Sequence, residues 1–393
     1  QTPANSHLIL FPITITIESE KMWVFTFYFN KKMKKMYSKL CMLVCISIGL
    51  SACGQTAKKV ENSSSKNEST EVNNSNLKME TVNLNDPNLE EQWKKEPYYG
   101  KKIKVGFEGA LCTSGLGVAQ VKGFFAKYGL DAEIINTPNM FDAIGTGKLD
   151  AITHHISASM VPAFNGVDMV FARAAQTGCR SLYVLNNSDI KSTKDLVGKE
   201  VAISGGGIGG HDHNIALRFL FRDGVDYKSV KFKPIESAAT IQAMKNGEVH
   251  AAILSDQFAK KFVDSGELRY IRSITFDDDF KEEPCCTLIL NKTFVEQNPI
   301  TAAKLVEAHK EASNWIEDNK YDAAKLMKAN NWGSGDVESD YKFLQTYNFK
   351  VTDEQMEKTL NQVINDYKEF GIITKDVSTQ DILNKIYKPR KVK

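Results

Sequence analysis

An α/β pattern that occurs twice along the chain restricts the fold more than any other feature of the sequence. Residues 142–152 read DAIGTGKLDAI and residues 242–252 read QAMKNGEVHAA, with Gly147 and Gly247 at matching positions. In both copies a helical segment ends near a glycine and an apolar strand follows. The offset of about 100 residues is too long for a solenoid repeat. The sequence therefore predicts two similar α/β lobes, each built on a sheet with helices on both faces.

Further apolar segments extend this pattern around both copies. Apolar runs or alternation predict strands, and apolar residues three or four apart predict helices. Strands are expected at 103–107, 131–135, 150–152, 201–203 and 230–234, and helices at 118–128, 140–146 and 214–222. Two more strands, 180–185 and 287–290, are expected to cross between the lobes. Later helices, expected to pack around the first lobe, span 299–319, 321–330, 352–370 and 379–386.

The order of these segments predicts the domain boundaries. The first lobe is expected to comprise 101–185 and 284–393, including a helical C-terminal tail, and the second lobe 186–283. Residues 54–100 contain a stretch rich in Lys, Asn, Ser and Glu, which predicts a flexible tether. A cleft between two such lobes is a preferred place for a ligand.

The segment before this tether has the composition of an export signal. A basic run at 31–35 precedes an apolar stretch at 40–50, which is well short of the roughly 20 residues that span a bilayer. These features predict a signal peptide at 33–53. Residues 1–32 do not fit this plan, and we interpret them as a non-native upstream segment.

The end of this signal is more specific. Leu50–Cys53, which reads LSAC, resembles the lipobox of bacterial lipoproteins. The resemblance implies that Cys53 is lipidated and anchors the protein at the extracytoplasmic face of the cell membrane, because several acyl chains together give stable attachment. The chain as a whole has a globular composition, with 42% hydrophobic residues and a net charge of +2. Its basic residues are interleaved with acidic ones, which argues against nucleic-acid binding.

Three segments resemble a family of solute-binding proteins that serve importers of nitrate, sulfonates, taurine and thiamine-pyrimidine precursors. They are Gly123–Asp131 (GFFAKYGLD), Gly147–Ala151 (GKLDA) and Ile190–Lys199 (IKSTKDLVGK). The resemblance, which covers roughly residues 101–330, implies a two-lobed α/β fold of the periplasmic-binding-protein type II class. It also implies that the ligand lies between the lobes, near residues 108–117, 153–159 and 204–214.

The residue types in these loops bear on the kind of ligand. Ser204–Gly210 is rich in glycine and lies between a strand and a helix, where backbone N–H groups favour an anion. If Glu108 and Asp256 both face the cleft, they favour a cationic or amine-bearing ligand instead. Gln176 is a further candidate. The predicted ligand-binding residues are Glu108, Cys112, Thr113, Ser114, His154, His155, Cys179, Gly206, Gly207, His211, Asp256, Cys285 and Cys286.

The four cysteines of the folded part are expected to converge at the cleft. Cys112 lies in the first strand–helix loop, and Cys179 and Cys285–Cys286 each directly precede an expected crossing strand. Three interpretations remain open: buried or disulfide-bonded cysteines, contact with an organic ligand, and metal or reactive chemistry. The spacing matches no recognised zinc motif, and neither a metal nor a cofactor is predicted. Hydrogen bonding is favoured over metal ligation for the histidines.

These features together predict a lipid-anchored, monomeric solute-binding component of an ABC importer. It would capture a small polar organic molecule between its lobes, without catalysis, and deliver the molecule to a membrane permease. Two alternatives use the same Cys and His residues. One is an enzyme similar to the pyrimidine-precursor synthases that share this fold, and the other is a lipoprotein that binds a metal or a metallophore.

Overall fold

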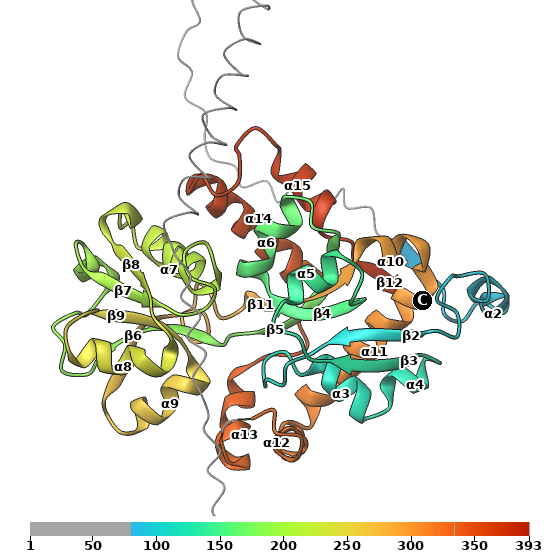
Figure 1. The fold of residues 1–393 in the computed structure, drawn as a ribbon, viewed down its shortest axis with the longest axis horizontal. Coiled ribbons are helices and arrows are strands. Elements are labelled where there is room, and N and C mark those ends of the chain that lie inside the picture. The colour runs from blue at the N-terminus through green and yellow to red at the C-terminus, as the bar shows by residue number, and fades with distance from the viewer. Residues whose placement is uncertain (1–79, 334, 393) are drawn as a thin grey trace, which may run out of the picture. The chain divides into compact units, whose positions relative to one another are not determined.

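The computed structural model describes residues 80–333 and 335–392, which form two α/β lobes (Figure 1). The predictions for the upstream segment, the signal peptide and Cys53 lie outside the described residues. Among the helices of the described part, none is both long enough and apolar enough to cross a bilayer.

Lobe 1 is built on a mixed five-stranded sheet. Strand β2 pairs in parallel with β3 and β4, whereas β11 is antiparallel to both β4 and β5. Strands β5 and β11 are buried along their whole length, because helices cover both faces of the sheet. In spatial order the strands are β3 (Asp131–Ile135), β2 (Lys102–Gly106), β4 (Ala151–His155), β11 (Pro284–Asn291) and β5 (Met169–Thr177).

Lobe 2 repeats this arrangement, which confirms the duplication predicted from the sequence. Strands β8, β7 and β9 are parallel, like β3, β2 and β4, and β6 is antiparallel to β9, as β11 is to β4. The similar segments 142–152 and 242–252 contribute to equivalent helix–strand units, α5 (Met140–Gly145) with β4 and α8 (Ser237–Lys245) with β9. In spatial order the strands are β10 (Leu268–Ser273), β6 (Arg180–Leu185), β9 (Ala251–Ser255), β7 (Glu200–Ile203) and β8 (Lys231–Pro234).

The chain crosses between the lobes at 178–179 and again between β10 and β11. The segments expected to cross, 180–185 and 287–290, instead lie inside the sheets, because each pairs with a strand on both sides. Strand β6 thus belongs to lobe 2, and the predicted boundary at residue 185 moves to Gly178–Cys179. Cys179 has a φ of 113°, in a region that residues with a side chain rarely adopt. Backbone strain is therefore stored where the lobes join.

Two separate apolar cores cover the two faces of the lobe 1 sheet. One face carries α3 (Gly115–Val121), α4 (Phe124–Lys127) and α11 (Pro299–Asp318), and the other carries α5, α6 (Ile156–Phe164), α14 (Asp353–Glu369) and α15 (Thr379–Ile386). The single helix predicted at 118–128 is divided into α3 and α4, because Gly123 between them adopts a left-handed φ of 73°. Further helices of this lobe are α10 (Lys292–Gln297), α12 (Lys320–Ala329) and α13 (Val337–Thr346).

The predicted C-terminal helices are confirmed as α11, α12, α14 and α15, and α11 and α14 pack on the lobe 1 sheet. In lobe 2, α7 (His211–Arg222) covers one face and α8 with α9 (Asp256–Asp264) the other. Two short 3₁₀ helices, η1 (Thr193–Leu196) and η2 (Tyr227–Ser229), lie beside α7. The apolar core under α7 is continuous with one core of lobe 1 through Cys179, Ile274 and Cys285.

The folded part begins before residue 101, where the tether was predicted to end. Strand β1 (Glu80–Val82) pairs with β12 (Arg390–Val392), and α2 (Leu89–Trp93) ends at a buried tryptophan. Trp93 Nε1 donates a hydrogen bond of 2.8 Å to Thr301 Oγ1, and the Glu96 carboxylate accepts one of 2.9 Å from the Thr301 N–H. Residues 80–100 are therefore part of lobe 1, because an indole and a helix-capping carboxylate hold them there.

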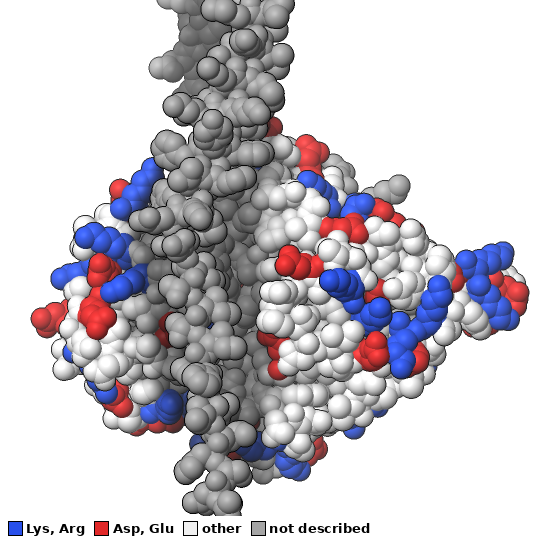
Figure 2. Space-filling model, viewed as in Figure 1, with Lys and Arg blue, Asp and Glu red and all other residues white. Residues whose placement is uncertain are grey.

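Buried ion pairs join the lobes on the side of α7. Arg218 lies 2.8 Å from Asp366 of α14 and 2.8 Å from Glu283 of the returning crossing, and Arg222 lies 3.1 Å from Asp366. On the surface, basic and acidic side chains are interspersed over the visible face of both lobes, where the described residues are exposed (Figure 2).

Candidate functional site

Polar side chains gather where neighbouring strands of lobe 1 end beside lobe 2. His155 ends β4 and is paired in register with Cys286 of β11, and Cys286 is paired with Gln176 of β5. Residues directly opposite each other on antiparallel strands project to the same face of a sheet. The Cys286 Sγ accordingly lies 3.2 Å from His155 Nδ1. An imidazole and a thiol from different strands are thus brought into contact.

The structure brings the four cysteines of the folded part together, as expected. All four are free thiols, and Cys179 Sγ lies 3.2 Å from Cys285 Sγ. Cys285 Sγ is in turn 3.5 Å from His155 Nδ1. A hydrogen bond with Cys179 raises the pKa of the Cys112 and Cys285 thiols, and burial raises the pKa of Cys286. The thiols are consequently protonated at neutral pH in the ligand-free protein.

Lobe 2 contributes His211, the first residue of α7. Its ring stacks on the ring of His155 with the centroids 3.7 Å apart and the planes 12° from parallel. Its Nδ1 is hydrogen-bonded to the Ser157 hydroxyl of α6, so that lobe 1 also orients the ring. Burial above all lowers the pKa of both His155 and His211, which makes them neutral imidazoles with an available lone pair.

Several buried polar atoms in this region have no partner among the described residues. They include Nε2 of His211 and both side-chain polar atoms of Gln176, a residue that is completely buried. Buried polar groups are normally hydrogen-bonded, and an exception points to a missing water, ion or ligand. The unsatisfied atoms therefore indicate that a water, an ion or a ligand binds in this region.

Four of these side chains present ligand atoms within reach of one centre. One atom each from His155, Cys179, His211 and Cys285 lies within 4.8 Å of every other. We call these four residues the Cys/His cluster. The set contains two imidazoles and two thiols, the donors that zinc and similar transition metals prefer. The four residues come from β4, the crossing segment, α7 and β11, so both lobes contribute.

The glycine-rich turn before α7 is already occupied by a carboxylate of the same lobe. The N–H groups of Ser204 and Gly205 donate hydrogen bonds of 3.0 and 2.7 Å to Asp212 Oδ2. The other oxygen of Asp212 lies 3.6 Å from Arg180 Nε. Two of the backbone donors expected to favour an anionic ligand thus bind Asp212 instead, because Asp212 lies in the first turn of α7, next to the glycine-rich turn. Gly206 and Gly207 follow with left-handed φ angles of 80° and 65°.

The carboxylate of Asp256 has its contacts within lobe 2. It accepts hydrogen bonds of 2.7 Å from the hydroxyls of both Ser181 and Tyr183, and one from Thr275. Burial raises its pKa. The structure therefore places the Asp256 carboxylate in a hydrogen-bonded core next to the crossing, where the Asp256 N–H donates a hydrogen bond of 3.1 Å to the Cys179 carbonyl, but Asp256 is not one of the four residues of the Cys/His cluster.

Four other predicted residues differ in their burial and their contacts. Glu108 is exposed and Thr113 is half-buried, whereas Ser114 is buried and donates a hydrogen bond of 2.8 Å to the Leu111 carbonyl. His154 packs on the ring of Phe141, with the centroids 4.6 Å apart, and burial lowers its pKa to about 4. These four residues are not members of the Cys/His cluster.

Sequence reasoning missed the polar groups that position the cluster. Ser157 orients His211, and Asp212 neutralises Arg180, yet neither was predicted to have a role. The sequence did contain a signal for Asp212. In the motif His-Asp-His at 211–213 the acidic residue lies in the first turn of a helix, next to the N-terminal N–H groups of that helix. No local pattern marked Ser157.

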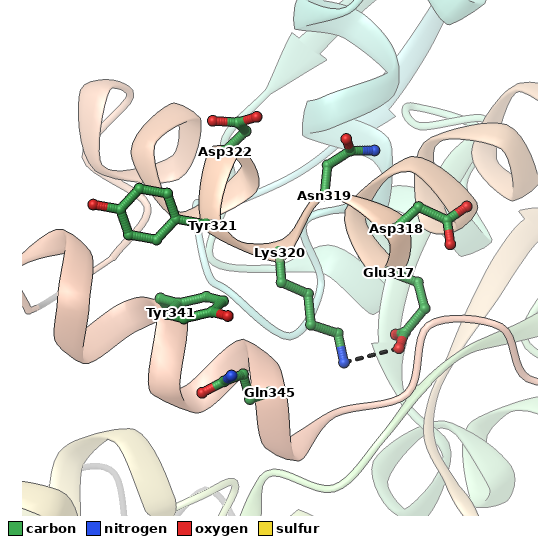
Figure 3. A pocket seen from close by; sticks show the side chains of 8 residues that line it. All are labelled: Glu317, Asp318, Asn319, Lys320, Tyr321, Asp322, Tyr341 and Gln345. Carbon is green, nitrogen blue, oxygen red and sulfur yellow. Dashed lines mark ion pairs between the residues drawn. The ribbon is translucent and has the colours of Figure 1, made fainter.

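A hollow of about 600 Å³ lies elsewhere, between α11, α12 and α13 (Figure 3). It contains an ion pair of 2.8 Å between Lys320 and Glu317, and its lining is polar. A much smaller cavity of about 30 Å³ adjoins the Cys/His cluster at Cys285, with both lobes in its lining. The lobes are thus closely apposed around the cluster. The lining residues of the larger hollow are Glu317, Asp318, Asn319, Lys320, Tyr321, Asp322, Tyr341 and Gln345.

Two duplicated mixed sheets, joined by two crossings, define the periplasmic-binding-protein fold, the fold of solute-binding proteins of ABC importers. The structure is similar to the periplasmic aliphatic sulphonate-binding protein SsuA of Escherichia coli, with 18% sequence identity and a TM-score of 0.60 over 74% of this chain and 94% of that one. It is also similar to the periplasmic nitrate-binding protein NrtA of Synechocystis PCC 6803, with 18% identity and a TM-score of 0.59 over 73% and 86% of the two chains.

A third similar structure is the alkanesulfonate-binding protein SsuA of Xanthomonas axonopodis pv. citri bound to MOPS. It has 13% identity and a TM-score of 0.58 over 72% of this chain and 97% of that one. Residues 97–329 match the model of the NMT1-like family, and the chain belongs to this family. A comparison with curated protein sequences found no match. The family and fold predicted from the sequence are thus confirmed.

Proposed function

We propose that this protein is the solute-binding component of an ABC importer and that it captures its solute between the lobes at the Cys/His cluster. The observation that carries the proposal is the contact between His155 of lobe 1 and His211 of lobe 2. A species bound by both residues holds the lobes together, and its binding energy favours the closed arrangement over an open one.

The chemistry of the region supports capture without catalytic turnover. The thiols are protonated in the ligand-free protein, whereas the thiolate is the nucleophilic form of cysteine. The carboxylates nearby, Asp212 and Asp256, are engaged by several donors of their own lobe. The solved structures that this chain resembles include named sulphonate- and nitrate-binding proteins.

Analysis of what the protein retains tests this function. The full chain is purified from its native membranes without chelator and denatured, and the released small molecules and metals are quantified by mass spectrometry. One equivalent of an unmodified solute per chain is the expected result. Covalent modification of the protein, or conversion of the retained compound by added protein, would argue for an enzyme instead.

We further propose that the protein is anchored through lipidated Cys53 at the extracytoplasmic face of the cell membrane and acts there as a monomer that delivers its solute to a permease. In bacteria fed an alkyne-bearing fatty acid, the full chain should take up the label and remain in the membrane fraction. Cys53→Ser should lose both properties, whereas Cys45→Ser, in the apolar part of the signal, should keep them. Persistent labelling of the Cys53→Ser chain would disprove the anchor.

A further inference from the structure

The donor atoms of the Cys/His cluster restrict the chemistry of the ligand as well as its position. A polar organic molecule is recognised by hydroxyl, amide and charged groups, whereas a thiol is a weak donor and a weak acceptor of hydrogen bonds. Cys112, Cys179, Cys285 and Cys286 together are therefore poorly suited to bind an organic solute by hydrogen bonds. They are well suited to a metal that prefers sulfur.

The distances in the cluster are close to those of a tetrahedral metal site. Zinc–sulfur bonds of about 2.3 Å and zinc–nitrogen bonds of about 2.0–2.1 Å place neighbouring ligand atoms roughly 3.3–3.8 Å apart. The Cys179 and Cys285 sulfurs are 3.2 Å apart, and Cys285 Sγ is 3.5 Å from His155 Nδ1. All four ligand atoms lie within 4.8 Å of one another. Side-chain rotation is therefore required to complete the site.

His211 is already held in the way that metal-binding histidines are held. Such a histidine usually ligates through one ring nitrogen while the other is hydrogen-bonded to a fixed partner. In this protein Nδ1 is bound to Ser157, whereas the buried Nε2 has no partner among the described residues. The ring now stacks on His155, and ligation by both rings requires them to turn, because each lone pair lies in its ring plane.

The charge of the filled site also suits its burial. Cys179 and His211 are almost completely buried, with 3% and 4% of their surface exposed. Two thiolates and two neutral imidazoles around a divalent cation have no net charge, so the filled site avoids the cost of an unpaired buried charge. On binding, each thiol releases its proton to solvent as its metal–sulfur bond forms, and no electron is transferred.

We propose that His155, Cys179, His211 and Cys285 form a tetrahedral site for a thiophilic divalent transition-metal ion, and that this ion, bare or within a small complex, is the solute. The second part rests on the solute-binding function proposed above. Because the ligands come from both lobes, the ion bridges them, and its release requires lobe 2 to withdraw His211.

The test is a titration of the full chain with Co²⁺ as a spectroscopic probe, followed by competition with Zn²⁺. The protein is first reduced and stripped with a chelator, because a disulfide between Cys179 and Cys285 would remove two ligands. One Co²⁺ per chain is expected, with the intense visible absorption of a tetrahedral ion and a thiolate-to-cobalt charge-transfer band. Zn²⁺ should abolish both signals.

Matched variants locate the site. The charge-transfer band should disappear in the Cys179→Ser/Cys285→Ser chain, and His211→Gln should weaken binding by at least 100-fold. His213→Gln is the control, since His213 lies on the same helix but is not in the cluster. If a cluster variant fails to fold, protection of the wild-type thiols from a thiol reagent by Zn²⁺ decides the question instead. Absence of binding by the reduced protein, or binding that survives the cluster substitutions, would overturn the proposal.

Metal analysis of protein purified from native membranes separates this inference from the broader function. One metal equivalent without an organic partner supports the bare ion, and one equivalent of each supports a metal complex. An organic solute without metal would refute the metal site but leave the solute-binding function intact. A chain that retains neither, and whose stripped form binds neither Co²⁺ nor Zn²⁺, would contradict both proposals.

Discussion

Arg218 offers a quantitative test of how the lobes are held together. Arg218 is 6% exposed, and its guanidinium lies 2.8 Å from both Asp366 and Glu283. Burial disfavours its charge, but the two carboxylates outweigh this effect and raise its pKa. Arg218→Met keeps much of the side-chain volume and removes the charge. The two carboxylates then remain in the interface between α7, α14 and the returning crossing.

The size of the effect follows from this geometry. Breaking a buried ion pair by removing one partner costs about 3–5 kcal/mol, because a charge is left uncompensated. Arg222 stays 3.1 Å from Asp366 and continues to neutralise it in part. We therefore expect a loss at the lower end of this range, about 3 kcal/mol of unfolding free energy. Adding Glu283→Gln to Arg218→Met should restore most of it, since Arg222 still pairs with Asp366 and no unpaired carboxylate remains.

Urea unfolding of the full chain, followed by circular dichroism, measures these differences. Lys127→Met is the control, because Lys127 forms an exposed ion pair with Glu311 and its loss should cost at most about 1 kcal/mol. The reasoning would be refuted by an Arg218→Met variant no less stable than this control. It would equally be refuted by an Arg218→Met/Glu283→Gln variant no more stable than Arg218→Met alone.

Three further predictions follow from individual residues. Because Cys179 has a φ of 113°, Cys179→Gly should be more stable than Cys179→Ala by roughly 1 kcal/mol in urea unfolding, and equal stabilities would show that no strain is stored there. Ser157→Ala should weaken Co²⁺ binding about 10–100-fold and perturb the cobalt spectrum, and it should lower the stability of the metal-free chain by about 1–3 kcal/mol because the buried His211 Nδ1 loses its partner, whereas unchanged affinity would mean that Ser157 does not position His211. Burial raises the pKa of Asp150 above its ordinary value of 3.8, so its contribution to stability is present below that pH and is lost as pH rises through the higher folded-state pKa. Asp150→Asn should therefore flatten the pH dependence of unfolding free energy in this window, and an unchanged profile would contradict this assignment.

The duplicated architecture could be predicted because its signals are local. A helix that ends at Gly147 or Gly247 and an apolar strand after it can be recognised within about ten residues. Strands β5 and β10 had no such signal. Strand β5 is buried on both faces and therefore lacks alternation, and the residues of β10 are largely half-buried or exposed. Their absence from the prediction made 180–185 and 287–290 look like crossings instead of members of a sheet.

The convergence of the cysteines could be predicted from their places at the ends of strands. The particular set of four could not, because it depends on how lobe 2 approaches lobe 1. Sequence gave no reason to prefer Cys285 over Cys286, or His155 over His154, since neighbours on a strand project to opposite faces and the register decides between them. In the structure His155 is paired with Cys286, and Cys285 joins the cluster where the pairing of β11 with β5 is irregular, between Pro284 and Cys286.

Asp212 has a consequence for selectivity. In the glycine-rich turn it acts as a tethered internal ligand, and its effective concentration is fixed by the fold and not by the surroundings. A nitrate or sulfonate ion from solution would have to displace it from Ser204 and Gly205 and then leave it without a backbone donor beside Arg180. Asp212 thereby competes, at a concentration set by the fold, with any oxyanion for the backbone N–H groups of Ser204 and Gly205 before α7.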